Sequence, residues 1–452
     1  MRSAHDLTFD TALPAFVRLV SGVAGVQSVL DGEVSFLRDA NGVLTAILRK
    51  PLSDETRSRI DHEAISLSPY VQADLVTATP NELGDDGLAD LGGAVWETIY
   101  HGEKAGPPYA WLVDRRIVGA DWMISPRPPL DGPPVVVFAS LKGGVGRSTA
   151  LAVAAANFAF RGLDVLVIDL DLEAPGIGAM LLEQGDYPRF GCLDYFVEGL
   201  LDPARAPGPS DMVGTSAIVQ GRGLVHVVPV VGSMAEKFPQ NVMMKLARAT
   251  LDDPQAPDGG QSFLQRVRRL VEQLSASHPY HAIFVDARAG LAETTAAALL
   301  GLGAEVLLFG VDTPQTFVGY RQLLAHLSRF KVDGDSNDDW RRRLRFVHAK
   351  ASADRDRQAA LRDRAFEVFS DTIYDVEDSY RGDAEGAGPE PMNFDLDDPT
   401  APHAAWPILH HAEFLEFDPI GKPHQLRDEV YAPAFAPFLS SLRELVQRGD
   451  QS

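Results

Sequence analysis

The sequence contains very little cysteine, since Cys192 is the only one among 452 residues. A single thiol excludes a disulfide within the chain and a metal site built from cysteines of one chain alone. This usage fits a reducing compartment, and we predict a cytoplasmic protein. The N-terminus also lacks the charged segment followed by an apolar segment that marks a signal peptide.

Long hydrophobic runs are missing as well, because charge or proline interrupts every apolar stretch well short of the roughly 20 residues that span a membrane. Basic residues are outnumbered by acidic ones, 41 to 63, which gives a formal net charge of −22. A surface this acidic repels anionic lipid and nucleic acid at long range. We therefore expect a soluble protein without membrane binding, and nucleic-acid binding is possible but not favoured.

The composition is that of a globular protein, with 45% hydrophobic and 23% charged residues. Five of the ten residues at 125–134 are proline, which fixes φ and cannot continue a hydrogen-bonded ladder. This segment predicts a stiff linker between two domains, residues 1–124 and residues 135–452. A later segment, 375–400, is acidic and rich in glycine and proline, and we expect it to be mobile.

The first domain shows a small α+β pattern. Ala40-Asn41-Gly42 is a hairpin turn signal between two apolar stretches. Ser53 is a plausible N-cap because acidic residues follow it in the first helical turn. Strands are expected at 33–39, 43–50 and 71–78, and helices at 14–30 and 53–67.

From residue 135 onward, apolar strand-like segments alternate with helix-like ones. Continuous runs of β-branched residues with helices between them are typical of parallel strands covered on both faces. The pattern predicts an α/β fold with a doubly wound, mostly parallel sheet. Strands are expected at 135–140, 164–171, 224–231, 281–287, 304–311 and 344–350, and helices at 148–162 and 435–449.

A glycine-rich run, KGGVGRST at 142–149, stands between the first of these strands and a helix. Glycines let backbone N–H groups turn toward an anion, and the helix N-terminus adds its positive dipole end. The run departs from the usual phosphate-loop pattern, because Leu141 replaces the first glycine and Arg147 replaces the lysine. Arginine keeps the charge but presents a planar fork, so we expect nucleotide binding to survive better than hydrolysis.

Two further motifs, VLVIDLDLEAPG at 165–176 and IFVDARAG at 283–290, also lie at strand ends. Together with the glycine-rich run, and in this order, they resemble the ParA/MinD family of P-loop ATPases, which carry a deviant Walker A motif. The resemblance covers roughly residues 135–350. It implies an ATPase that binds ATP and Mg²⁺ and forms a homodimer on ATP binding.

The resemblance also implies residue roles. Lys142 matches the signature lysine that reaches the partner's ATP across the dimer, and Asp171 matches the aspartate that positions the attacking water. The residues implied to bind nucleotide are Lys142, Gly143, Gly144, Val145, Gly146, Arg147, Ser148, Thr149 and Gly290. Those implied to hold the metal are Ser148, Asp169 and Asp286.

These roles predict a nucleotide-switched dimeric ATPase, slow in hydrolysis, that positions or regulates an unidentified protein partner. Residues 1–124 are the candidate for binding that partner. Two alternatives stay open, a nucleotide-bound scaffold that does not hydrolyse ATP and a DNA-binding partition ATPase that uses 341–343. Glu173, in DLDLEAPG, departs from the proline-glutamine that partition ATPases usually carry after their aspartate, which weakens the second alternative. No metal site is expected at the pair 410–411, and the last helix is expected to pack in the core.

Overall fold

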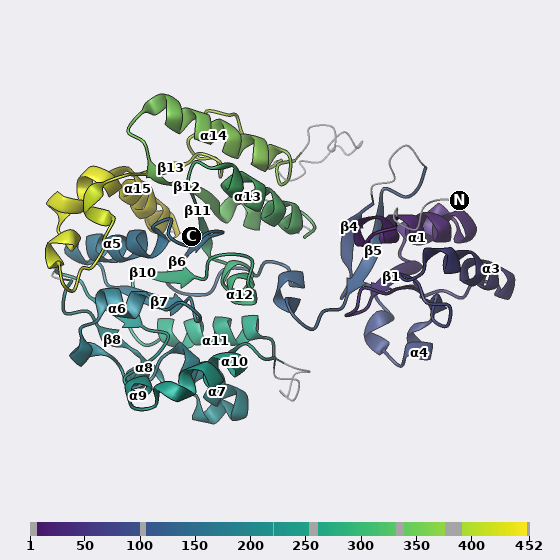
Figure 1. Ribbon diagram of the computed structural model, residues 1–452, viewed down its shortest axis with the longest axis horizontal. Helices are drawn as coiled ribbons and strands as arrows, with labels where there is room; N and C mark the ends of the chain where they lie inside the picture. The colour runs from purple at the N-terminus through teal and green to yellow at the C-terminus, as the bar shows by residue number, and fades with distance from the viewer. Residues whose placement is uncertain are drawn as a thin grey trace. The chain divides into compact units, whose positions relative to one another are not determined.

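The computed structural model describes residues 7–99, 105–219, 221–252, 261–330, 339–375 and 391–449. The chain forms two compact units, one made chiefly of residues up to Met123 and the other starting at Ile124 (Figure 1). Most of the acidic segment predicted to be mobile, residues 376–390, lies outside the described residues. None of the described helices has both the length and the apolarity that crossing a bilayer requires.

The first unit is built on a five-stranded sheet of order β3-β2-β1-β5-β4. Its core forms between this sheet and α1, where Phe16 packs edge-to-face on Phe36 with ring centroids 5.5 Å apart. The elements are α1 (Phe9–Ala24), α2 (Val26–Leu30), β1 (Val34–Arg38), β2 (Leu44–Leu48), α3 (Asp54–Ala64), β3 (Thr77–Ala78), α4 (Pro80–Leu83), β4 (Val95–Thr98) and β5 (Tyr109–Asp114).

The predicted hairpin is confirmed, since β1 and β2 pair antiparallel and Gly42 takes a φ of 92° in the turn. The predicted N-cap is confirmed too, because the Ser53 side chain accepts a hydrogen bond from the N–H of Thr56. The strand expected at 71–78 is wrong for most of its length, because a turn closed by Leu75 N–H on Gln72 C=O leaves only β3.

The second unit is built on an eight-stranded sheet of order β13-β12-β11-β6-β10-β7-β9-β8. Every neighbouring pair among these strands is parallel except β8 with β9, and all residues of β6, β7 and β10 are buried. The predicted α/β fold with a mostly parallel sheet is therefore confirmed. The strands are β6 (Val135–Ser140), β7 (Val165–Leu170), β8 (Gly214–Thr215), β9 (Val225–Val228), β10 (Ala282–Ala287), β11 (Glu305–Gly310), β12 (Leu344–Ala351) and β13 (Trp406–Leu409).

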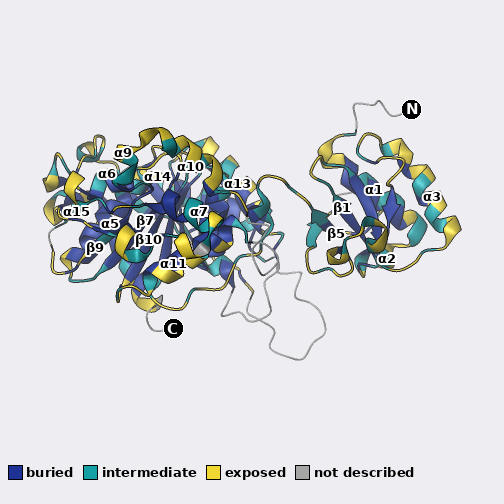
Figure 2. Ribbon diagram, turned by 90° about the horizontal axis from the view of Figure 1, so that it is seen from below, coloured by how far each residue is buried: buried dark blue, intermediate teal, exposed yellow. Residues whose placement is uncertain are grey.

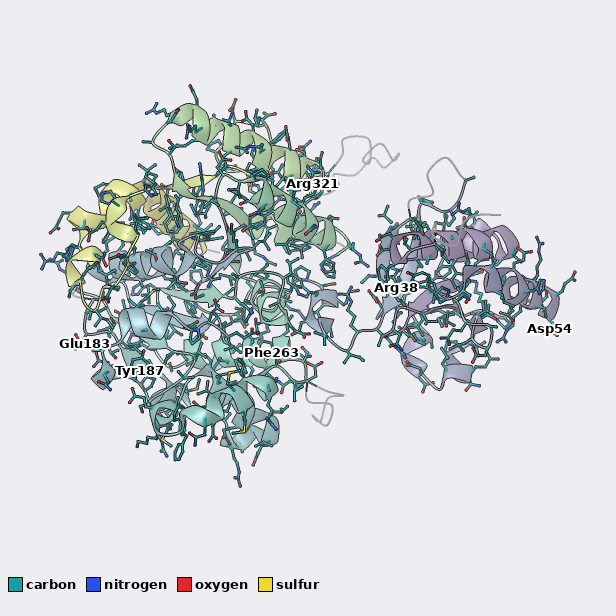
Figure 3. All side chains as sticks on the ribbon, viewed as in Figure 1. Arg38, Asp54, Glu183, Tyr187, Phe263 and Arg321 are labelled. Atoms are coloured by element: carbon teal, nitrogen blue, oxygen red, sulfur yellow. The ribbon has the colours of Figure 1, made fainter. Side chains whose placement is uncertain are left out.

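Helices cover both faces of this sheet, and its strands form the buried interior of the unit (Figure 2). α5 (Arg147–Phe160) and α15 (Asp428–Gly449) pack on one face, while α12 (Glu293–Gly301) packs against β6 and β10 and α11 (Phe263–Ser275) packs on α12. Phe263, labelled in Figure 3, meets the ring of Phe196 at a centroid distance of 4.9 Å. The other α-helices in the described part of this unit are α6 (Ile177–Leu181), α7 (Cys192–Leu201), α8 (Pro209–Met212), α9 (Met234–Lys237), α10 (Val242–Ala249), α13 (Pro314–Leu327) and α14 (Arg355–Ser370).

The last helix, α15, packs in the core as expected. Phe438 is fully buried, and its ring centroid lies 6.3 Å from that of Phe138 and 6.0 Å from that of Phe309. The helix begins seven residues earlier than the expected 435, with two prolines inside it. The strand that precedes the phosphate loop is thus held from one face by the C-terminal helix.

The proline-rich segment after Ile124 lies against the second unit. The N–H of Arg127 donates to the carbonyl of Leu300 at 2.7 Å, and the carbonyl of Pro128 accepts from Arg268 at 2.9 Å. Gly303 leaves room for this segment, because a Cβ there would lie 2.2 Å from the Pro128 carbonyl oxygen. These contacts hold the segment against the middle of α11 and the C-terminal end of α12.

Candidate phosphate-binding site

A glycine-rich loop joins the buried strand β6 to α5. Gly144 and Gly146 have φ angles of 75° and 96°, which favour glycine. No atom lies within 4 Å of a Cβ placed at either glycine, so backbone conformation and not crowding selects glycine there. A loop of this conformation that leads into a helix N-terminus is a ready anion site. All residues predicted from Lys142 to Thr149 lie in this loop or in the first turn of α5.

Three acidic residues reach the same edge of the sheet. β10 lies between β6 and β7, and Asp286 of β10 is directly in register with Asp169 of β7. Asp171 follows the end of β7. Because parallel strands end at one edge, the three predicted carboxylates converge beside the loop.

Arg147 is the centre of this cluster. Its side chain is only 8% exposed, and its Nε donates to Asp286 Oδ1 at 2.5 Å while its Nη2 donates to Asp171 Oδ2 at 2.9 Å. The Nη1 lies 3.5 Å from Ser140 Oγ, at the outer limit of a hydrogen bond. The sequence predicts Arg147 as a nucleotide ligand, and in the structure its guanidinium bridges two carboxylates.

Asp286 has both carboxylate oxygens engaged. Oδ1 accepts from Arg147, and Oδ2 accepts from the hydroxyl of Ser148 at 2.7 Å. Burial raises the pKa of Asp286, and the contacts with Arg147 and Ser148 oppose that shift. This places two of the predicted metal ligands, Ser148 and Asp286, in direct contact.

Asp169 is fully buried and organises the backbone that follows β7. Its Oδ1 accepts from the N–H of Asp171, and its Oδ2 accepts from the N–H groups of Gly176 and Ile177, each at 3.1 Å. Burial, and then the neighbouring Asp286, raise the pKa of Asp169 to about 8. Asp169 therefore acts on the site by fixing the turn that carries Asp171.

Mg²⁺ takes oxygen ligands, and commonly one or two carboxylates together with water. Asp286 and Ser148 are groups of that kind, but each carboxylate oxygen of Asp286 already accepts a hydrogen bond. Asp171 Oδ1 is buried without a hydrogen-bond partner in the described part of the chain. It offers the metal one carboxylate oxygen. In residues 7–449, where the structure describes them, no three His, Cys, Asp or Glu side chains are grouped to hold a metal. The predicted ligand set does not fit Mg²⁺ in this arrangement, because Arg147 already supplies the cation.

Lys142, the predicted signature lysine, borders a hollow beside the loop. Lys142 is exposed, and its Nζ donates to Gln315 Oε1 at 3.3 Å. It lines a hollow of about 480 Å³ together with Gly290, whose N–H donates to the Ser140 carbonyl at 2.9 Å. Gly290 has a φ of 95°, so this predicted nucleotide-binding residue also needs the conformational freedom of glycine. Lys142 and Gly290, both predicted to bind nucleotide, thus line the same hollow.

Sequence reasoning missed Lys350. Its Nζ donates to the Gly144 carbonyl at 2.7 Å, and its φ of 54° is the sole positive value among the non-glycine residues that the structure describes. Lys350, Thr149, His410 and His411 line a second, smaller hollow beside the loop. The signal available was its position at the end of a predicted strand.

Two basic residues, Arg266 and Arg341 of the predicted DNA-binding segment 341–343, are engaged in internal contacts. Arg266 is buried and donates to the carbonyls of Phe196 and Ala249 at 2.9 and 2.8 Å. Arg341 pairs with Asp339 at 2.7 Å and with Asp375 at 2.6 Å. These two guanidinium groups are therefore not free to bind a nucleic-acid backbone.

Residues 136–313 match the family model described as the CobQ/CobB/MinD/ParA nucleotide binding domain. The matched region contains the loop at 142–149, the motif at 165–176 and the motif at 283–290, which are the three segments on which the resemblance depended. None of the curated proteins compared with this chain matches it.

Several solved structures are similar to parts of the chain. The MinD cell division protein of Aquifex aeolicus is 18% identical, with 69% of this chain and 97% of that chain covered and a TM-score of 0.41. The cell division ATPase MinD of Pyrococcus furiosus is 20% identical, with 50% and 75% covered and a TM-score of 0.32. Cobyrinic acid a,c-diamide synthase of Mycobacterium smegmatis, solved with a bound ATP analog and magnesium, is 18% identical, with 51% and 80% covered and a TM-score of 0.34.

Proposed function

We propose that this chain, whose residues 136–313 match the CobQ/CobB/MinD/ParA nucleotide binding domain, binds ATP at the loop from Lys142 to Thr149 and uses the bound nucleotide as a switch. The observation that carries the proposal is the conformation of that loop. Two glycines with positive φ stand between a fully buried strand and a helix N-terminus. This arrangement offers backbone N–H groups and a helix dipole to the phosphates.

The switch acts through dimerisation. Lys142 is exposed, and its only modest contact with Gln315 Oε1, at 3.3 Å, can be given up when the side chain approaches the nucleotide of a second copy. Leu291 and Val318 are 50% and 58% exposed, and both belong to the elements that line the hollow beside Lys142. Apolar side chains exposed next to a nucleotide loop support a face that a second copy covers.

Hydrolysis at this site is slow. Asp171 is the residue proposed to orient the attacking water, and its Oδ2 is held by Arg147 at 2.9 Å. Phosphoryl transfer depends mainly on positioning and on charge stabilisation, so a carboxylate held in an ion pair orients water poorly. The magnesium ion expected from the resemblance forms no part of this proposal, because its predicted ligands are engaged with Arg147 and Ser148.

The first unit binds the protein partner that the nucleotide state controls. It has its own hydrophobic core and its own sheet, so it is a candidate binding module in its own right. Deleting residues 1–123 is expected to leave ATP binding intact and to abolish partner binding. Retention of all partner binding by the shortened chain would move the partner site to the second unit.

Calorimetry with ATP tests the central proposal, and light scattering with and without ATP tests dimerisation. We expect a one-to-one binding heat, a higher midpoint of thermal unfolding and a doubled molar mass. If saturating ATP gives no binding heat and no change in the midpoint of thermal unfolding, the nucleotide proposal is wrong.

The second candidate function is a nucleotide-bound scaffold that does not turn over, and the contact between Arg147 and Asp171 favours it. Phosphate release by the wild type is compared with release by Asp171→Ala. Equal rates would select the scaffold, and faster release by the wild type would select the slow ATPase. The internal contacts of Arg266 and Arg341 disfavour DNA partitioning as the function. A change in the electrophoretic mobility of DNA that depends on ATP and weakens with salt would favour it again.

A further inference from the structure

We propose that the guanidinium of Arg147 takes the place of a divalent cation between Asp171 and Asp286. The wild-type site therefore excludes Mg²⁺ and binds its triphosphate without requiring the metal. The part that concerns the triphosphate rests on the proposed function. The part that concerns the metal rests only on the side chains of this cluster.

The geometry places one cation between two anions. Two different nitrogens of Arg147 contact two different carboxylates, Nε to Asp286 at 2.5 Å and Nη2 to Asp171 at 2.9 Å. The side chains of Asp286 and Asp171 are 1% and 10% exposed, so water screens this contact little. A bound divalent ion would bridge the same two carboxylates.

Charge balance opposes replacement of the guanidinium by Mg²⁺. Removing one partner from a buried ion pair leaves an uncompensated charge, which is strongly unfavourable. An incoming Mg²⁺ would also have to shed water, which it does reluctantly. It would then have to release Asp286 Oδ1 from Arg147 and Oδ2 from the hydroxyl of Ser148.

The surrounding loops hold the guanidinium in this position. Arg147 opens α5, so its backbone is fixed by the helix. The loops after β7 and β10 are joined a second time by an ion pair between Arg288 and Glu173. The loop after β10 is also tied to the end of β6 by the hydrogen bond from Gly290 N–H to Ser140 C=O at 2.9 Å. Three strand ends therefore confine the same cation.

Arginine suits this role better than lysine does. Its planar fork offers several N–H groups in a fixed geometry, so one side chain can contact two carboxylates in different directions. Lysine presents a single compact ammonium on a flexible stem. Arg147, which departs from the phosphate-loop pattern, thus neutralises Asp171 and Asp286.

The first arm of the test uses Mn²⁺ without nucleotide. Binding to the full chain is followed by electron paramagnetic resonance and by the midpoint of thermal unfolding. We expect Arg147→Ala to bind Mn²⁺ at least about tenfold more tightly than the wild type does. The gained site would be formed by Asp171, Asp286 and Ser148. Adding Asp286→Asn to Arg147→Ala should remove the gained site.

Arg288→Ala is the matched control, because it removes the other arginine that joins these loops and frees only the exposed Glu173. It should gain no Mn²⁺ site. If Arg147→Ala does not fold by circular dichroism, Arg147→Gln replaces it at similar length. The proposal is overturned if the wild type binds Mn²⁺ as tightly as the variant, or if the folded variant gains no site.

The second arm compares binding of a non-hydrolysable ATP analogue in Mg²⁺ and in EDTA. We expect the wild-type affinity to change by less than about threefold, and Arg147→Lys to lose on the order of tenfold in EDTA. A wild-type loss of tenfold or more in EDTA overturns the proposal. If the wild type binds no nucleotide at all, the proposed function fails, and the Mn²⁺ arm still decides whether Arg147 excludes the metal.

Discussion

The ammonium group of Lys350 donates a 2.7 Å hydrogen bond to the carbonyl oxygen of Gly144. Lys350 lies in β12, which is two strands away from β6 in the sheet, and its backbone adopts a positive φ of 54°. Non-glycine residues take this conformation rarely. The conformation of the phosphate loop is therefore stabilised by a strand far from it in sequence.

The first prediction follows from that contact. Lys350→Met keeps the length of the side chain and removes the donor to Gly144. Nucleotide affinity should fall about fivefold, because a net hydrogen bond contributes roughly 1 kcal/mol. Calorimetry measures the effect, and Lys422→Met is the control because Lys422 pairs with the exposed Glu416 at 3.5 Å. Equal affinities of wild type and Lys350→Met would show that the contact does not support binding.

The second prediction concerns the glycines of the loop. Gly146→Ala forces alanine into a φ of 96° with free space around it, so only backbone strain changes. The cost of about 1–2 kcal/mol should lower the unfolding midpoint and weaken nucleotide binding. Gly143→Ala is the control, since Gly143 has no positive φ and no atom within 4 Å of its Cβ. A similar loss in both variants would assign the effect to the added methyl group.

Much of the fold could be predicted from local patterns, and the exceptions have physical causes. The β-branched runs of β6, β7 and β10 are buried on both faces, so they carry an unambiguous strand signal. β13 is only four residues long and contains Pro407, which makes its sequence similar to a loop. His410 and His411 follow that missed strand, and for this reason their position beside the phosphate loop was not predicted.

The sequence predicts which residues form the candidate site, but it does not predict the contacts that they make. Asp169, Asp171 and Asp286 follow strands that end at one edge, so their convergence follows from the parallel sheet. The position of the guanidinium of Arg147 depends on its rotamer and on three loops, and neither can be read from spacing along the chain. Lys350 was missed because its contact with Gly144 is non-local and requires a rare φ.

The third prediction tests how the proline-rich segment attaches to the second unit. Gly303→Ala would place a Cβ 2.2 Å from the Pro128 carbonyl oxygen, in addition to the strain of a φ of 60°. Gly162→Ala carries the strain of a φ of 86°, with a neighbour at an ordinary 3.6 Å. Gly303→Ala should therefore lower the free energy of unfolding by about 1–3 kcal/mol more than Gly162→Ala, measured by denaturant titration. Equal losses of unfolding free energy in the two variants would mean that the proline-rich segment can shift away from residue 303 without destabilising the fold.

The fourth prediction is a pH dependence in the first unit. A hydrogen bond from Arg57, then one from the Thr79 backbone, lower the pKa of Glu82 to about 2. A lowered folded-state pKa stabilises the fold above the unfolded value of about 4.3, and this contribution disappears as the pH falls toward 2. Carboxyl ¹³C NMR should show Glu82 titrating near 2 in the wild type and at a higher pH in Arg57→Gln, where the pKa stays below its ordinary value because the Thr79 N–H still donates.

Arg59→Gln is the control for that titration, because Arg59 pairs with Glu63 on the same helix and not with Glu82. It should leave the titration of Glu82 unchanged. A wild-type Glu82 that titrates in the ordinary range would contradict the role of Arg57.

The burial of α15 beside the phosphate loop has a consequence for synthesis of the protein. Phe435 lines the hollow next to Thr149, and Phe438 packs on Phe138 of the strand that leads into the loop. A ribosome completes that loop long before it has made β12, β13 and α15, so the apolar side of β6 leaves the exit tunnel without its cover. Chains stalled before α15 should bind chaperones and aggregate, since exposed apolar strands associate readily.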